Sequence, residues 1–133
     1  MAGEQLHSDR FTKTYNILFV EDDRVLNHLV KIYSKNLFNL DGVFDAESAL
    51  GKLIDSHYDL FLLDINLGEG MNGIELLRRI RQHENYKNAP AIAATAYAMK
   101  GDKEYLLSQG FNGYLPKPFT KTELLDYIQI FLK

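Results

Sequence analysis

The chain has 133 residues, 46% of them hydrophobic and 25% charged, and its net charge at pH 7 is -3. Such a length and composition are typical of one globular domain, and no basic balance points to nucleic acid as a direct partner. The absence of cysteine excludes disulfides, thiolate catalysis and Cys-ligated zinc. No apolar run approaches the roughly 20 residues that span a bilayer, and the polar N-terminus lacks a secretory signal. We therefore expect a cytoplasmic protein with no membrane contact.

The first half of the chain alternates between strand and helix patterns. Residues 1–14 are polar and predict a disordered tail, which leaves residues 15–133 as the folded domain. "YNILFV" (15–20) predicts a buried strand. "GVFD" (42–45) is a short strand candidate, and "AESALGKLID" (46–55) predicts a helix. Between the two strands, apolar residues at helical spacing predict an amphipathic helix: Leu26, Leu29, Val30, Tyr33 and Leu37.

The second half continues the alternation, with clear signals at the helix ends. "LFLLD" (60–64) predicts a strand buried on both faces, and "AIAAT" (91–95) and "FNGYL" (111–115) predict two more. A helix over about residues 99 to 109 should end at Gly110. Asn72 with Glu75, and Thr120 with Glu123, have the spacing of capping boxes that begin helices. The apolar faces of those two helices are Ile74, Leu77 and Ile80, and Leu124, Ile128 and Phe131.

Five strands that alternate with helices predict an α/β fold with a parallel sheet covered on both faces. Crossovers in such sheets are right-handed. We expect the doubly wound, flavodoxin-like strand order 2-1-3-4-5, in which ligands bind outside the carboxyl ends of the strands, at the point where the order reverses. This edge of the sheet is therefore where a functional site is expected.

Polar residues follow the strands at this edge. Glu21 and Asp22 follow the first strand, Asp64 ends the third, Thr95 ends the fourth and Lys117 follows the fifth. Two like charges about 4 Å apart repel by roughly 4 kcal/mol at an effective dielectric of 20, so one lysine cannot neutralise three carboxylates. Mg²⁺ would neutralise them, because it prefers oxygen ligands. Together these residues predict phosphoryl transfer onto Asp64 as nucleophile.

The motifs "ILFVEDD", "DLFLLDINL", "MNGIELLRRIR", "PAIAATAYAMKGD" and "FNGYLPKPF" occur in this order between residues 16 and 132. In these motifs the chain resembles the CheY-like receiver domains of bacterial two-component response regulators. The resemblance implies a signalling module, rather than a turnover enzyme, that accepts a phosphoryl group from a sensor histidine kinase or histidine phosphotransfer protein. It also implies a downstream protein target, reached through the face built from the last helices and the last strand.

The resemblance assigns a role to each matching position. Asp64 corresponds to the phosphoacceptor, and Glu21, Asp22 and the backbone carbonyl of Asn66 to the other Mg²⁺ ligands. The remaining matches are the phosphoryl contacts and the switch: Thr95, Lys117 and the Ala96 amide for the phosphoryl oxygens, Thr95 and Tyr114 for the switch, and a cis Lys117-Pro118 bond.

Other readings stay open at several positions. Asp23 suits an N-cap of the first helix, and Tyr114 could simply fill the core. The loop "DINLGEGMNG" is one residue longer than the usual family pattern and lacks its proline, which leaves its effect on the site open. A small Mg²⁺-dependent phosphohydrolase that works through an aspartyl-phosphate is an alternative, although Asn66 stands where such enzymes need an acid. A degenerate receiver that acts only as an adaptor is another.

Overall fold

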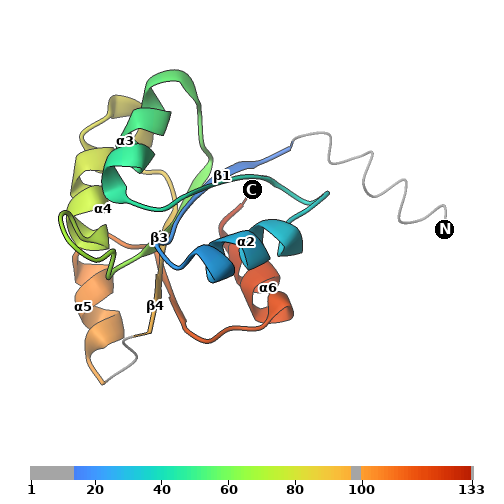
Figure 1. Cartoon of the computed structure of the whole chain (residues 1–133). Helices are drawn as coiled ribbons and strands as arrows, with labels where there is room; N and C mark the ends of the chain where they lie inside the picture. The colour runs from blue at the N-terminus through green and yellow to red at the C-terminus, as the bar shows by residue number, and fades with distance from the viewer. Residues whose placement is uncertain (1–13, 97–99, 133) are drawn as a thin grey trace, which may run out of the picture.

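The structure is a computed structural model that describes residues 14–96 and 100–132 (Figure 1). Strands and helices alternate along the described chain as predicted. The strands are β1 (Asn16–Val20), β2 (Asn39–Val43), β3 (Leu60–Asp64), β4 (Ala91–Thr95) and β5 (Gly113–Pro116). The helices are α2 (Arg24–Tyr33), α3 (Ala46–Asp55), α4 (Gly73–Arg81), α5 (Asp102–Ser108) and α6 (Lys121–Phe131), with a short 3₁₀ helix at Glu84–Tyr86. Of the tail predicted over residues 1–14, all but Thr14 lies outside the described residues.

The five strands form one parallel sheet in the order β2-β1-β3-β4-β5, which confirms the predicted topology. Because β1 and β3 are neighbours, Val20 pairs with Leu63, and the residues that follow β1 lie beside the end of β3. Thr95 at the end of β4 pairs with Pro116 of β5. The carboxyl ends of β1, β3, β4 and β5 therefore meet at one edge.

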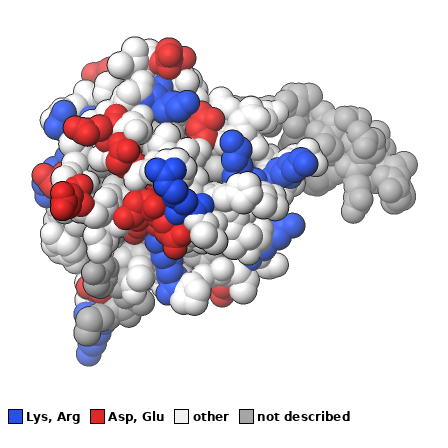
Figure 2. Space-filling view, in the orientation of Figure 1, with Lys and Arg blue, Asp and Glu red and all other residues white. Residues whose placement is uncertain are grey.

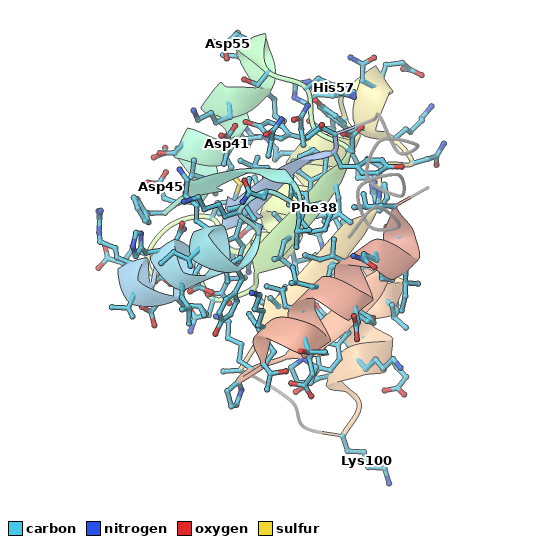
Figure 3. All side chains as sticks on the ribbon, turned by 90° about the vertical axis from the view of Figure 1, so that its right-hand side faces the viewer. Phe38, Asp41, Asp45, Asp55, His57 and Lys100 are labelled. Atoms are coloured by element: carbon cyan, nitrogen blue, oxygen red, sulfur yellow. The ribbon has the colours of Figure 1, made fainter. Side chains whose placement is uncertain are left out.

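Two apolar layers hold the helices against the sheet. Alternate residues of each strand point to opposite faces, as in any strand. Helices α3, α4 and α5 cover one face, and α2 and α6 cover the other (Figure 1). In Figure 3 the α2 and α6 side of the sheet faces the viewer. Leu60 to Leu63 of β3 have no exposed surface, because β3 is the central strand and is covered on both faces. Among the described residues, no helix has the length and apolar character needed to cross a membrane.

The helix boundaries confirm most of the predicted caps. Asn72 with Glu75, and Thr120 with Glu123, form complete capping boxes, and the Asp23 carboxylate caps α2. Gly110 follows the C-cap of α5 with φ of +107°. Helix α5 begins at Asp102, later than the predicted residue 99, which lies outside the described residues.

Three predicted boundaries were wrong. The second strand is Asn39–Val43 rather than residues 42–45, because it pairs along the whole of β1 and Asp45 instead caps α3. The last strand is Gly113–Pro116 rather than residues 111–115, since its pairing with β4 begins at Gly113. Leu37 is not part of the first helix, which ends at Tyr33, and its side chain is 48% exposed.

A half-buried guanidinium organises the opposite end of the domain. Arg81, the last residue of α4, donates to four oxygens: the carbonyls of Tyr86, Ala89 and Gly110, and the side chain of Asn112. Burial lowers the pKa of Arg81 below its usual value. The loops that lead into β4 and β5 are thus fixed to the end of one helix.

Candidate functional site

Three carboxylates converge at the carboxyl edge of the sheet, as predicted. Glu21 follows β1 and is 1% exposed, Asp64 ends β3 and is 5% exposed, and Asp22 is exposed. One oxygen from each of the three lies within 4.8 Å of the others. Figure 2 shows acidic side chains gathered in the middle of this face, over the ends of β1 and β3.

The ammonium of Lys117 lies between two of these acids. Its Nζ is 2.5 Å from Glu21 Oε1 and 3.3 Å from Asp64 Oδ2. Burial and the charge of Asp64 raise the pKa of Glu21 to about 7, although the hydrogen bond from Lys117 opposes that rise. Burial favours the neutral amine of Lys117, but its contacts with Glu21 and Asp64 outweigh burial and raise its pKa. The site therefore holds a charged lysine and more acid than that lysine can neutralise.

The predicted hydroxyl and aromatic side chains lie on the two neighbouring strands. Thr95 is 1% exposed at the end of β4, and its carbonyl accepts a hydrogen bond of 2.8 Å from the Lys117 backbone N–H. Tyr114 lies half-buried on β5, where it pairs with Ala93. Burial and the charge of Asp102 raise the pKa of Tyr114. The strand pairing thus links Thr95, Lys117 and Tyr114 through β4 and β5.

Two predictions concern the backbone at this edge. Ala96 is exposed and immediately follows β4, and the role of its amide stays a prediction. The Lys117-Pro118 peptide bond is cis, as the family resemblance implied.

The unusual loop after β3 lies beside the acids. The Asn66 N–H donates to Asp64 Oδ1 at 3.3 Å, and the Asn66 side-chain oxygen accepts from the Gly68 N–H at 3.3 Å. Gly68 and Gly70 have φ of +80° and +92°, a conformation that favours glycine. A Cβ on Gly68 would lie 3.6 Å from Asp22 Oδ2, in ordinary contact. The longer loop therefore folds back next to Asp22.

The sequence analysis missed Asn27, whose side chain holds the backbone next to the acids in place through hydrogen bonds. Asn27 is a buried residue of α2, and its Nδ2 donates to the carbonyls of Glu21 and Val43 at 3.0 Å each. The Glu21 N–H also donates to the Val43 carbonyl at 3.0 Å. Gly42 makes room for the amide, because a Cβ there would lie 2.0 Å from Asn27 Oδ1. The only sequence signal was a polar residue at the edge of the apolar stripe.

Gly73 was also missed, and it determines how closely α4 approaches β3. Its N–H donates to the Ile65 carbonyl at 2.9 Å. A Cβ on Gly73 would lie 2.2 Å from the Asp64 carbonyl oxygen and 2.9 Å from Ile65 Cα. Only glycine allows this contact, so the start of α4 packs directly against the backbone of Asp64.

The donor set fits a hard divalent cation. Carboxylate oxygens are the ligands that Mg²⁺ prefers, and those of Glu21, Asp22 and Asp64 are close enough together to share one ion. The lysine beside Asp64 adds a cation that suits phosphate oxygens. The fold and the site together define a doubly wound α/β domain with an acidic site at its switch point.

Comparison with known proteins agrees with this class. The family model for the response regulator receiver domain matches residues 17–129. The response regulator ArlR of Staphylococcus aureus is 35% identical over 118 residues, which are 88% of this chain and 52% of ArlR. The receiver domain of sensor histidine kinase PA1611 from Pseudomonas aeruginosa, solved with a magnesium ion in its active-site cleft, is 34% identical with a TM-score of 0.79, over 90% of this chain and 98% of that one. CheY4 of Vibrio cholerae is 25% identical with a TM-score of 0.83, over 90% and 100%.

The chain belongs to the response regulator receiver domain family of two-component systems. It spans about half the length of the curated relative ArlR.

Proposed function

We propose that Asp64 is the phosphoacceptor of this receiver domain and that a histidine kinase or histidine phosphotransfer protein supplies the phosphoryl group. One observation carries the proposal: a buried carboxylate at the end of the central strand lies 3.3 Å from the Lys117 ammonium and beside two further acids. A carboxylate placed only for structure would not need a cation and two acids around it.

In the transfer, an Asp64 carboxylate oxygen attacks the phosphorus atom of a phosphohistidine. A P–O bond forms, the P–N bond breaks, and the electron pair of that bond returns to the imidazole ring of the partner. Lys117 and the Thr95 hydroxyl hold phosphoryl oxygens, with the Ala96 amide as a further donor. Glu21, Asp22, Asp64 and the Asn66 carbonyl would hold Mg²⁺, which when bound supplies positive charge that the three acids and the phosphoryl group require.

Phosphorylation then biases a two-state switch. Thr95 and Tyr114 lie on paired strands, and Tyr114 packs against the apolar layer on the α5 side of the sheet while it also borders the groove between β5 and α6. A shift of Thr95 toward the phosphoryl group would let Tyr114 change position and remodel the surface of α5, β5 and α6 for a downstream protein. The cytoplasmic location and the disordered tail over residues 1–14 remain predictions.

The phosphohydrolase alternative is weaker, because the Asn66 amide cannot act as a general acid and its oxygen already accepts from the Gly68 N–H. We therefore propose a signalling module that undergoes phosphorylation rather than an enzyme that turns over a substrate. The adaptor alternative predicts that no stable adduct forms at Asp64.

Intact-protein mass spectrometry after incubation with acetyl phosphate tests the proposal. Wild type should gain one phosphoryl group only when Mg²⁺ is present, and Asp64→Asn should gain none. Asp55→Asn, which removes an exposed acid at the far end of α3, is the matched control and should be labelled like wild type. An adduct that persists in Asp64→Asn, or a folded wild type that is never labelled, would refute the assignment of Asp64.

A further inference from the structure

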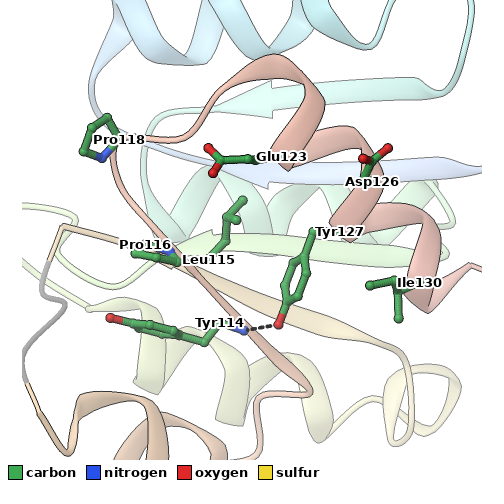
Figure 4. Close-up of a pocket in the computed structure, with 8 residues that line it drawn as sticks. All are labelled: Tyr114, Leu115, Pro116, Pro118, Glu123, Asp126, Tyr127 and Ile130. Atoms are coloured by element: carbon green, nitrogen blue, oxygen red, sulfur yellow. Dashed lines mark hydrogen bonds between the residues drawn. The ribbon is translucent and has the colours of Figure 1, made fainter.

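A groove runs between the edge strand β5 and helix α6 (Figure 4). Its volume is about 460 Å³, which is within the roughly 300–1,000 Å³ of typical ligand sites. This space holds a few side chains of a partner rather than a whole helix. The residues that line it are Tyr114, Leu115, Pro116, Pro118, Glu123, Asp126, Tyr127 and Ile130.

The lining combines apolar surface with acid. Ile130 is 61% exposed, although it is a large apolar side chain. Glu123 and Asp126 are exposed and lie one turn apart on α6, and both residues line the groove (Figure 4). One Glu123 oxygen accepts from the Thr120 N–H, and no lysine or arginine is among the lining residues. A ligand with positive charge and an apolar group complements this surface.

The strand edge limits how a partner can bind. The Tyr114 N–H already donates to the Tyr127 hydroxyl at 2.8 Å (Figure 4), and Pro116 has no N–H. A partner strand added to β5 would need backbone donors from the edge, and these two positions supply none. These two positions therefore favour a partner that binds through its side chains over one that adds a strand to β5.

We propose that this groove binds a basic segment of a partner protein, with arginine or lysine side chains against Glu123 and Asp126 and an apolar side chain against Ile130. The inference rests on the proposed function, because Tyr114 lines the groove and is also the residue expected to respond to phosphorylation of Asp64. On this basis the downstream target carries a segment that is both cationic and amphipathic.

An NMR titration of the full chain with two designed peptides tests this. The first peptide carries arginine and leucine on one helical face, and the second has glutamate in place of every arginine. The arginine peptide should shift the amide signals of the groove residues, and added salt should weaken its binding. Glu123→Gln/Asp126→Asn should raise its Kd about fivefold or more, as the loss of two exposed ion pairs implies. Glu47→Gln/Asp55→Asn makes the same change of net charge on α3, away from the groove, and should leave the Kd unchanged.

Several outcomes would overturn the proposal. They are equal binding of both peptides, shifts centred on Glu21, Asp22 and Asp64 instead of the groove, or equal loss of binding in the two double variants. Groove shifts that depend only on protein concentration would identify a second copy of the chain as the occupant and would also overturn it. If Glu123→Gln/Asp126→Asn is unfolded by circular dichroism, Ile130→Ser replaces it, with the same expected rise in Kd.

The proposal for Asp64 and the proposal for the groove can be refuted independently of each other. The same samples are treated with acetyl phosphate and Mg²⁺ and weighed by mass spectrometry. An adduct at Asp64 without peptide binding would refute the groove alone, and peptide binding without an adduct would refute the phosphoacceptor alone.

Discussion

The contact between Gly73 and the Asp64 backbone gives the sharpest test of how the site is built. In Gly73→Ala the new Cβ would start 2.2 Å from the Asp64 carbonyl oxygen. Ordinary contact needs about 3.4 Å, so the start of α4 and the end of β3 must separate by about 1 Å. Both sides of the contact are backbone, and no side-chain rotation can relieve it. Overpacking of this kind costs about 1–3 kcal/mol.

Gly51→Ala is the matched control. Gly51 lies inside α3, is exposed, and has nothing within 4 Å of its would-be Cβ. Alanine there should stabilise the domain by about 0.5–1 kcal/mol through helix propensity alone. Gly73→Ala should therefore lower the free energy of unfolding, and Gly51→Ala should raise it.

Urea denaturation measures the free energy of unfolding of both variants, and acetyl phosphate labelling measures the site. A displacement of about 1 Å at a reacting group can cost about 10²-fold in rate, so Gly73→Ala should be labelled much more slowly than Gly51→Ala. The reasoning is refuted if Gly73→Ala is as stable as Gly51→Ala and is labelled at the wild-type rate.

Three further changes follow from the contacts described above. Asn27→Ala removes the side-chain donor to the Glu21 carbonyl and one of the two donors to the Val43 carbonyl, and should cost about 1–3 kcal/mol in urea denaturation; wild-type stability would contradict this. Arg81→Met should cost about 2 kcal/mol or more, because it removes the donor to four oxygens. Arg78→Met, which removes one exposed contact to Gln109, should cost under about 0.5 kcal/mol, and equal losses would count against the role of Arg81. Glu21→Gln should stabilise the metal-free protein at pH 8 but not at pH 4, measured by urea denaturation at both pH values.

The sequence predicted the fold through signals that depend on local chemistry. Capping residues such as Asn72 and Thr120 mark helix starts because their side chains satisfy backbone N–H groups within the same turn. The central strand was clear because both of its faces are buried. The edge strand β2 was misplaced, since its residues Asp41 and Gly42 give no alternation and its limits come from pairing with β1.

Site residues could be predicted from the sequence where they follow strands whose carboxyl ends meet at one edge of the sheet. Glu21, Asp22 and Asp64 were found in this way, because parallel topology brings their positions to one edge. The support behind them was not predictable. Asn27 and Leu29 lie near opposite edges of the same helix stripe, and periodicity favoured the apolar residue. Only the tertiary contact with the carbonyls of Glu21 and Val43 explains why Asn27 is buried and Leu29 is 37% exposed.

The acids at the edge of the sheet lower the free energy of unfolding of the metal-free protein. The pKa of Glu21 determines how this effect changes with pH. Its pKa rises from 4.5 to about 7 on folding, so the folded state binds a proton more tightly than the unfolded state. The proton on Glu21 therefore stabilises the folded state, and this stabilisation is complete below about pH 4.5. It is lost as the pH rises through about 7, where the free energy of unfolding falls by on the order of 3 kcal/mol. A glutamine cannot lose the proton, so the advantage of Glu21→Gln should grow across this window. A constant difference between the two proteins from pH 4 to pH 8 would show that burial and Asp64 do not destabilise the Glu21 carboxylate.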